Sequence, residues 1–408
     1  MEEQVLPYIN KKRVKELLSQ LVKINSPFWE EDQIIDYTYT WFKAKGIPVE
    51  YHLYQEREVT GYQGKNIVGQ LLGQKQGPLV VLNGHLDTVN ICEGWTRNPL
   101  GAEIEGDRLY GVGALDMKGG CAAMMLAIEA FAATVEDFHG GVLYTLVSGE
   151  EGPYGLGTDA LLLEGYFAKA DLAIVPEPSG AFAGRPFPCL CLGARGGWKY
   201  TITVKGRSAH AANPTRGINA ISEAAKLLLA LEKTKLAEHP QLGSGSISVL
   251  DFEGGGQPLS VPDRAAFSVF RHVIIGEDQD YLRQEVEQAI VRAGLTAEVE
   301  MNFRAAPHPA NAGFKPYLVS KNNPYTRVIK DSIKTTTGRE AGIAYFPSVG
   351  DYNYLASRAK LPTYVIGPAG ANYHRPDEYV ELESVVQTAR IIYDFLKLIL
   401  VQERGRLG

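Results

Sequence analysis

The chain has 408 residues, of which 45% are hydrophobic and 22% charged, and its formal net charge is −6. This length suggests two domains with ample material for a hydrophobic core. The acidic balance, without any run of Lys or Arg, argues against a nucleic-acid partner and against an acidic membrane surface.

The N-terminus lacks the pattern of a signal peptide, and no apolar run approaches the roughly 18 residues of a membrane span. Four cysteines in a chain of this length do not form a disulfide framework. We therefore expect a cytoplasmic protein whose cysteines are reduced and structural: Cys92, Cys121, Cys189 and Cys191.

The first half of the chain predicts alternating helices and strands. Apolar residues at helical spacing predict three helices, over residues 11–23, 30–45 and 119–132. Apolar runs predict four strands, over residues 65–72, 78–83, 141–148 and 172–175. Continuously apolar strands that alternate with helices indicate an α/β fold with a mostly parallel central sheet.

The pattern changes after Pro188. Strands and helices are now predicted in the order β-α-β-β-α-β, over 197–205, 217–233, 246–252, 265–275, 279–293 and 296–303. This order is the ferredoxin-like split motif. We therefore expect an inserted second domain at 190–305, while 1–189 and 306–408 form the first domain, which ends in a helix over 382–401.

A histidine and a carboxylate follow the apolar strand at 78–83. Residues i and i+2 of an extended chain point to the same side, so His85 and Asp87 can act together. His85 would ligate a metal, and Asp87 would hold the imidazole from behind and fix its tautomer. A His-x-Asp pair alone is more often a polar strand end, so the hypothesis depends on further ligands.

Four further candidate ligands lie at or beyond predicted strand ends or on glycine-rich loops: Asp116, Glu151, Glu177 and His374. Open α/β sheets place their sites at the carboxyl ends of strands. Two histidines with three carboxylates suit a pair of divalent ions such as Zn²⁺. One carboxylate must bridge if five residues serve two ions about 3.5–4 Å apart. Glu150, next to a candidate ligand but itself free, is then available as a base.

Six motifs occur in order between residues 83 and 380: GHLDTV, GALDMKGG, SGEEG, VPEPS, RSAHAANPTRGINA and GANYHRPDEYV. In these motifs the chain resembles the dinuclear-zinc amidohydrolase and metallopeptidase family of acetylornithine deacetylase, succinyl-diaminopimelate desuccinylase, aminoacylase and carboxypeptidase G. The resemblance implies a phosphorylase/hydrolase-like catalytic domain with an inserted ferredoxin-like dimerisation or lid domain. It implies a metal-dependent hydrolase that cleaves an amide bond, of the N-acyl-amino-acid deacylase type.

The resemblance also implies a role for each candidate residue. The ligands would be His85 and Glu177 for one ion and Glu151 and His374 for the other, with Asp116 bridging. Asp87 would support His85. Glu150 would be the general base, which takes a proton from the attacking water and passes it to the leaving nitrogen. The ions would be Zn²⁺, with Co²⁺ as a substitute.

In the inserted domain, the resemblance implies that His210 reaches the active site of a partner subunit and stabilises the tetrahedral oxyanion. This role requires a homodimer formed through 190–305. Arg271 matches an arginine that grips the substrate carboxylate. Two positions depart from the family pattern: Ser260 stands where Asn is common, and Phe270 stands where an acidic residue commonly precedes the arginine. Ser260 can still donate a hydrogen bond to a substrate, but both departures weaken the transfer of any specific substrate.

Three alternatives remain open. The same dinuclear site could serve a dipeptidase or carboxypeptidase, with a short peptide in place of an N-acylated amino acid. A non-catalytic dimeric binding protein would be expected to lack Glu150 or a ligand, and neither is lost. A nucleotide site at Gly111-x-Gly113 lacks the third glycine and a strand that leads straight into it.

Overall fold

The computed structural model describes residues 2–401. They form two compact units: a large unit, made of the residues up to 194 and those from 318 onward, and a small unit of 195–317.

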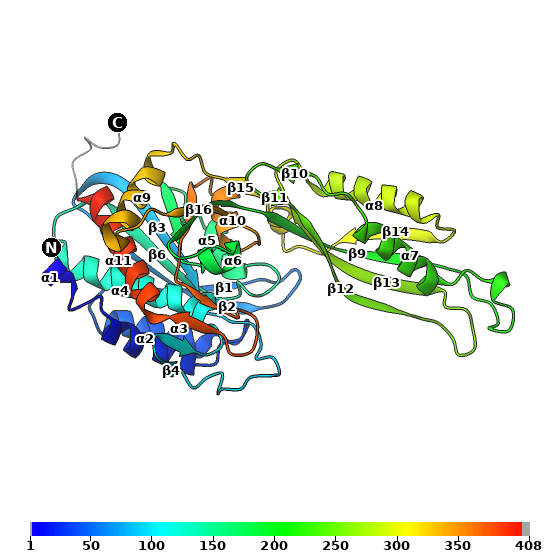
Figure 1. The fold of residues 1–408 in the computed structure, drawn as a ribbon, viewed down its shortest axis with the longest axis horizontal. Coiled ribbons are helices and arrows are strands. Elements are labelled where there is room, and N and C mark those ends of the chain that lie inside the picture. The colour runs from blue at the N-terminus through cyan, green and yellow to red at the C-terminus, as the bar shows by residue number, and fades with distance from the viewer. Residues whose placement is uncertain (1, 402–408) are drawn as a thin grey trace. The chain divides into compact units, whose positions relative to one another are not determined.

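The large unit is built on a nine-stranded sheet (Figure 1). Its strands are β1 (Glu50–Gln55), β2 (Gln63–Leu72), β3 (Lys75–His85), β6 (His139–Val147), β7 (Leu172–Val175), β8 (Cys189–Ala194), β15 (Tyr317–Leu318), β16 (Gly342–Phe346) and β17 (Thr363–Val365). Their order is β1-β2-β6-β3-β7-β17-β8-β15, with β16 paired to β8. The pairs β6–β3, β3–β7 and β7–β17 are parallel, whereas β1–β2 and β2–β6 are antiparallel. The predicted α/β fold with a mostly parallel central sheet is confirmed.

Helices of the large unit cover this sheet: α1 (Glu2–Val5), α2 (Lys11–Lys23), α3 (Asp32–Lys43), α4 (Gly119–Thr134), α5 (Leu156–Leu163), α6 (Ser179–Ala183), α9 (Pro324–Thr337), α10 (Asp351–Ser357) and α11 (Leu382–Leu400). α4 and α11 lie side by side and contact β3 (Figure 1). Small and apolar residues let α4 be buried on every side from Gly119 to Phe131. One apolar face of α11 packs against it.

A second, four-stranded sheet in the large unit joins distant parts of the chain, in the order β18-β19-β5-β4. Its strands are β4 (Glu103–Glu105), β5 (Arg108–Tyr110), β18 (Gly370–Ala371) and β19 (Tyr379–Glu381). Because β19 pairs with β5, the loop between β18 and β19 is brought beside the loop that follows β5.

The small unit is a four-stranded antiparallel sheet with two main helices. Its elements are β9 (Gly196–Lys205), α7 (Ala220–Glu232), β12 (Ser246–Gly255), β13 (Arg264–Val273), α8 (Gln279–Ala293) and β14 (Glu298–Phe303), with the short pair β10 (Glu238–His239) and β11 (Gly243–Ser244). The sheet order β12-β13-β9-β14 is that of a ferredoxin-like fold. Alternate residues of β9 and β13, such as Tyr200, Ile202 and Phe267, pack against α7 and α8 and form the core.

The boundaries of the small unit lie further along the chain than the predicted 190 and 305. Strand β8 belongs to the sheet of the large unit. After β14, Phe314 and Gly197 exchange two backbone hydrogen bonds, at 2.8 and 2.9 Å, which tie the following segment to the start of β9.

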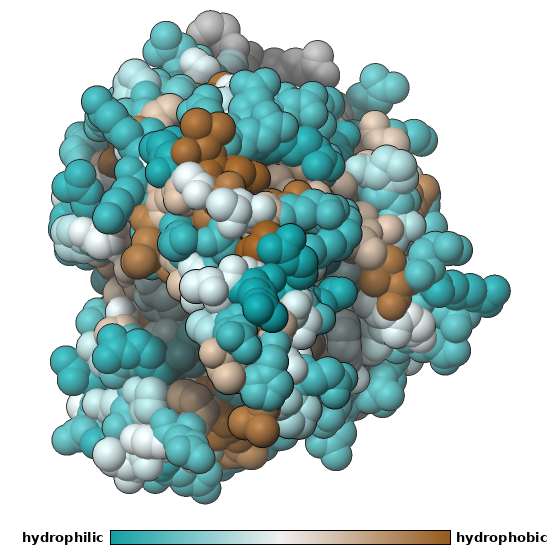
Figure 2. Space-filling view, turned by 90° about the vertical axis from the view of Figure 1, so that its right-hand side faces the viewer, coloured by the Kyte–Doolittle hydropathy of each residue, from teal (hydrophilic) through white to brown (hydrophobic). Residues whose placement is uncertain are grey.

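On the face shown in Figure 2, hydrophilic residues predominate and hydrophobic residues form small separate patches. No helix within residues 2–401 combines the length and the apolar character that a membrane span needs. All four cysteines are free; Cys121, Cys189 and Cys191 are buried, but Cys92 is exposed and is therefore not a core residue.

Candidate metal centre

Three neighbouring parallel strands end at one place on the sheet. β3 ends at His85, which pairs in register with Val147, the last residue of β6. Glu150 and Glu151 follow β6, and Glu177 follows β7 on the other side of β3. The carboxyl ends of parallel strands meet at one edge, so the sheet itself gathers these side chains.

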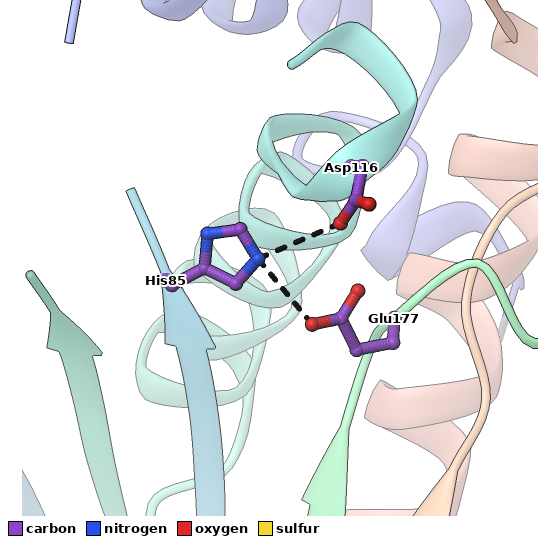
Figure 3. A group of neighbouring side chains, drawn as sticks. All are labelled: His85, Asp116 and Glu177. Carbon is purple, nitrogen blue, oxygen red and sulfur yellow. Dashed lines mark ion pairs between the residues drawn. The ribbon is translucent and has the colours of Figure 1, made fainter. Parts of the chain in front are cut away.

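His85 lies at the centre of the first group of side chains (Figure 3). Its Nε2 is 3.5 Å from Oδ1 of Asp116 and 3.4 Å from Oε1 of Glu177. All three residues are buried, and each offers a ligand atom within 4.8 Å of the others. Burial alone would lower the pKa of His85, but the charges of Glu150, Asp116 and Glu177 raise it well above its usual value.

A second group contains Asp116, Glu151 and His374, and meets the same distance limit. His374 Nε2 is 2.9 Å from Oε1 of Glu151 and 3.3 Å from Oδ2 of Asp116. His374 is brought there by the loop between β18 and β19, and its side chain is 44% exposed, so this group is open to solvent.

Asp116 is common to both groups and presents a different oxygen to each histidine. It lies in the loop between β5 and α4, and the peptide bond that follows it is cis. Burial opposes ionisation, but the nearby imidazoles of His374 and His85 hold the pKa of Asp116 below its usual range. Asp116 is therefore a carboxylate placed to span two cations.

The donor set fits two divalent ions. Two imidazole nitrogens with carboxylate oxygens suit Zn²⁺ and similar ions. His85 Nε2 and Glu177 Oε2 are buried atoms without a hydrogen-bond partner among the described residues. Burial, and next the charge of Asp116, raise the pKa of Glu177 to about 8. Such a cluster of buried carboxylates needs nearby positive charge, which ions between the two groups would supply.

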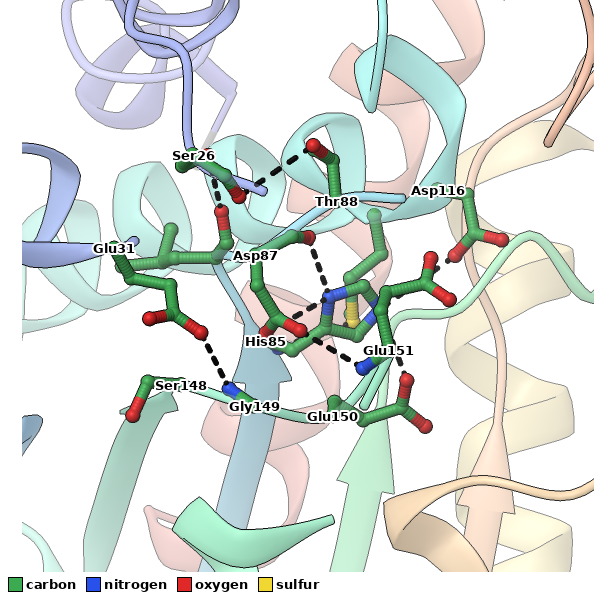
Figure 4. Close-up of polar contacts among 12 residues, drawn as sticks. Ser26, Glu31, His85, Asp87, Thr88, Asp116, Ser148, Gly149, Glu150 and Glu151 are labelled. Carbon is green, nitrogen blue, oxygen red and sulfur yellow. Dashed lines mark hydrogen bonds and ion pairs between the residues drawn. The ribbon is translucent and has the colours of Figure 1, made fainter. Parts of the chain in front are cut away.

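Asp87 has a different contact from the predicted one (Figure 4). Its carbonyl oxygen, not its carboxylate, lies 2.9 Å from Nδ1 of His85, whereas Oδ1 is 3.7 Å away. The carboxylate instead accepts the backbone N–H of Glu151 through Oδ2, at 2.8 Å. At the end of a strand, the residue two positions after a histidine can place either its main-chain carbonyl or its side chain behind the imidazole.

Glu150 lies beside the first group without belonging to it (Figure 4). Its Oε2 is 3.8 Å from His85 Nε2, and its Oε1 accepts the backbone N–H of Asp351 at 3.3 Å. A Cβ atom at Gly350 would lie 2.7 Å from that oxygen, so any other residue there would displace the Glu150 carboxylate from this position. Burial, and then the charges of Asp351 and Glu151, raise the pKa of Glu150 well above its usual value, against the opposite effect of His85. The raised pKa favours uptake of a proton by this carboxylate.

Two buried acids that were not among the predicted site residues also support the centre. Glu31 accepts the backbone N–H of Gly149 at 2.9 Å and the hydroxyl of Tyr62 at 2.6 Å, and so holds the turn that carries Glu150 (Figure 4). Glu378 accepts backbone N–H groups from the loop that carries Asp116. Glu31 is far in sequence from every candidate ligand, and Glu378 is marked only by its place four residues after His374.

His210 and Ser260 lie in the small unit, where an isolated antiparallel β-bridge joins them. His210 is exposed, and its Nδ1 accepts the backbone N–H of Ala212 at 3.1 Å. The other ring nitrogen remains available to a ligand or a partner chain.

Arg271 does not occupy the place predicted for it. Its side chain is fully buried in the small unit, and its Nε and Nη2 pair with Glu285 at 3.1 and 3.0 Å. Nη2 also pairs with Glu277 at 3.0 Å, and Nη1 donates to the carbonyl of His272. Along β13, Arg271 falls on the same side as Phe267 and Val269, which face the helices. With its donors engaged, it is a structural ion-pair residue and cannot grip a substrate carboxylate in this structure.

Two donor groups that share one carboxylate, with a basic acid beside them, are the arrangement of a metal-dependent hydrolase. The profile of Peptidase family M20/M25/M40 matches residues 81–398, and the chain belongs to this family. It is therefore a hydrolase of amide and peptide bonds, as its motifs predicted.

Relatives and solved structures agree with this assignment. A succinyl-diaminopimelate desuccinylase of Methylocella silvestris is 29% identical over 328 residues, which cover 78% of this chain and 82% of the relative. The aminopeptidase PepT of Bacillus cereus matches with a TM-score of 0.74 at 21% identity, over 96% of this chain and 99% of that one. The YXEP protein of Bacillus subtilis, a dinuclear metal binding peptidase of family M20, has a TM-score of 0.69 at 13% identity and covers 96% of this chain and 99% of its own. At these identities the two solved structures show a shared fold.

Proposed function

We propose that the protein is a dinuclear metal-dependent deacylase that hydrolyses the amide bond of an N-acyl amino acid. The observation that carries the proposal is the position of Asp116, whose two oxygens face His85 at 3.5 Å and His374 at 3.3 Å. His85 and Glu177 would hold one ion and Glu151 and His374 the other, with Asp116 shared between the two groups. Two ions, Zn²⁺ or Co²⁺, would polarise the scissile carbonyl and lower the pKa of a water toward 7.

Glu150 moves the proton. It belongs to neither donor group, yet its Oε2 lies 3.8 Å from His85 Nε2. From there it takes a proton from the attacking water and delivers it to the nitrogen of the leaving amine. The backbone N–H of Asp351, which donates to Oε1, keeps the other oxygen directed toward the reaction.

The small unit completes the site in a homodimer. His210 of the small unit donates a hydrogen bond to the oxyanion in the partner's site, and Ser260 lies beside it as a donor to substrate. β12 supports the dimer contact because it is an edge strand of the sheet, with Leu250 53% and Phe252 40% exposed. Exposed apolar residues on an edge strand favour pairing with another chain.

The proposed substrate class is supported by relatives that are named succinyl-diaminopimelate desuccinylases. A desuccinylase-like substrate presents an acyl amide and an amino-acid carboxylate. Because Arg271 is buried in the small unit and paired with Glu277 and Glu285, another donor must bind that carboxylate. We therefore assign the chemical class, an N-acyl amino acid, and not one acyl group.

A substrate panel tests the proposal. The Zn²⁺- or Co²⁺-loaded protein is assayed with N-succinyl, N-acetyl and N-formyl amino acids beside dipeptides, with Glu150→Gln as the control for contaminating activity. We expect release of the free amino acid from at least one N-acyl series at a kcat/KM well above that for any dipeptide. Turnover of dipeptides alone would make the protein a peptidase. No turnover together with no metal uptake would leave a non-catalytic binding protein.

A further inference from the structure

Glu378 is a buried carboxylate close to the metal centre but outside both donor groups. It lies four residues after His374, where the loop between β18 and β19 ends, and only 2% of it is exposed. A buried carboxylate is costly unless its oxygens accept hydrogen bonds.

The partners of Glu378 all come from one loop. Oε2 accepts the N–H of Gly113 at 2.9 Å, and Oε1 accepts those of Leu115 at 2.8 Å and Asp116 at 3.0 Å. The carbonyl of Glu378 also accepts the N–H of Gly111 at 3.0 Å. Four N–H groups of the turn from 111 to 116 therefore donate to this one residue.

This turn depends on such a partner. Gly113 has φ +72°, and Asp116 has φ −112° and ψ 96°, so the backbone here is neither strand nor regular helix. Its N–H groups are buried, and a buried N–H without an acceptor is destabilising. The carboxylate of Glu378 supplies the acceptors that regular secondary structure would otherwise provide.

We propose that Glu378 is a positioning residue that holds Asp116 across the two donor groups and couples it to the loop of His374. The inference rests on the proposed dinuclear site, in which Asp116 bridges. Glu378 touches no donor atom of either group, so it acts through the backbone of Asp116. Asp87, two residues after His85, likewise holds Glu151 by accepting its backbone N–H. The segments of His85 and of His374 thus each contain an acid that positions a candidate carboxylate ligand from another part of the chain.

Metal binding of the full chain tests this role directly. Metal-free wild type and Glu378→Gln are titrated with Zn²⁺ in competition with a chelator, and the visible absorption of Co²⁺ reports the coordination. An amide keeps one acceptor but turns N–H donors toward the N–H groups of the loop. We expect Glu378→Gln to bind Zn²⁺ about 10–100-fold more weakly and to change the Co²⁺ spectrum. At saturating metal its KM should stay within about twofold of wild type, because Glu378 does not reach substrate.

Asp377→Asn is the matched control. Asp377 is the neighbouring acid and also accepts backbone N–H groups, from Thr96 at 3.0 Å and Arg97 at 3.3 Å, but that loop carries no donor residue. Asp377 has φ +57°, which Asn tolerates. We expect wild-type affinity for both ions in this variant.

The result that would overturn the inference is a folded Glu378→Gln protein with wild-type metal affinity and spectrum. If Glu378→Gln does not fold, the metal affinity of Glu378→Asp is measured in its place. The shorter side chain keeps the negative charge but no longer reaches the N–H groups of the loop. Wild-type affinity in that variant would equally refute the role. If wild type itself binds one ion only, the proposed dinuclear site fails. Because Asp116 belongs to both groups, Glu378→Gln should still weaken the binding of that single ion.

Discussion

The imidazole of His85 is held by the main chain of Asp87, whose carbonyl oxygen lies 2.9 Å from Nδ1. This contact places the ring proton on Nδ1 and leaves Nε2 directed at the donor groups. The carboxylate of Asp87 is free for a second task, the N–H of Glu151.

Substitution of Asp87 separates its charge from its hydrogen bond. Asp87→Asn keeps an acceptor for the Glu151 N–H, and we expect a loss of metal affinity below about tenfold; Asp87→Ala removes the acceptor and should cost about 10–100-fold. The affinities are measured by chelator competition. Equal losses in the two variants would mean that the charge, and not the hydrogen bond, is what matters.

Glu150→Gln should separate chemistry from metal binding. The variant keeps the shape of the side chain but cannot take a proton, so kcat should fall by about 10²–10⁴-fold. Its metal content should stay at the wild-type value, whereas Glu151→Gln, which alters a donor residue, should lose metal. The checks are steady-state kinetics and elemental analysis of the same samples. Retained turnover in Glu150→Gln would exclude it as the base.

His210→Ala tests whether two chains share a site. We expect kcat to fall by about 10²–10³-fold with unchanged metal content, as for loss of an oxyanion donor. A heterodimer of His210→Ala with Glu150→Gln restores one intact site and should regain about half of the wild-type rate. His239→Ala, another histidine of the small unit, serves as the control. A heterodimer without activity would show that each chain uses its own His210 or none.

Arg271→Met should act on stability, not on substrate binding. Removal of the guanidinium leaves Glu277 and Glu285 buried without their partner, which should cost about 3–5 kcal/mol of unfolding free energy. Arg264→Met, at an exposed position of the same strand, should cost little. Urea unfolding of the full chain measures both. A large rise in KM with unchanged stability would mean that Arg271 binds the substrate, as the family resemblance implied.

The small unit should lose stability in acid through His272. Burial, and then the charges of Arg195 and Arg271, lower the pKa of His272 to about 4 from the 6.5 of an unfolded chain. The unfolded state therefore binds the proton more readily, and the stability contribution, present above pH 6.5, is lost as pH falls to about 4. The loss should reach about 3 kcal/mol at pH 4. Unfolding of wild type and His272→Asn is followed from pH 7 to 4; parallel pH profiles would contradict the assignment.

Periodic apolar residues and clear caps made several elements predictable. The predicted helices 11–23 and 279–293 coincide with α2 and α8, which begin at the N-caps Asn10 and Asp278. β1 was missed because most of its residues are exposed and polar on an edge strand. β18 and β19 are too short for any period to show, yet they pair with each other, and the pairing of β19 with β5 is what brings His374 to Asp116.

The candidate ligands could be chosen from the sequence because each follows an apolar strand or lies in a glycine-rich loop. The environment of Arg271 could not be predicted from the sequence. Its partners Glu277 and Glu285 come from a turn and a helix that only the tertiary fold brings to β13. The role of Glu378 was hidden for the same reason: a carboxylate that binds backbone N–H groups leaves no pattern in its partners' side chains.

The position of β17 has a consequence for biosynthesis. This strand lies between β7 and β8, although it follows them by more than 160 residues. A nascent chain that ends before Thr363 thus has its main sheet divided into two pieces, with β3 and β7 in one and β8 in the other. The small unit is encoded in one uninterrupted stretch and can fold during this time. His374 emerges after β17, so the protein acquires its last candidate metal ligand only once the strand that closes the sheet has been made.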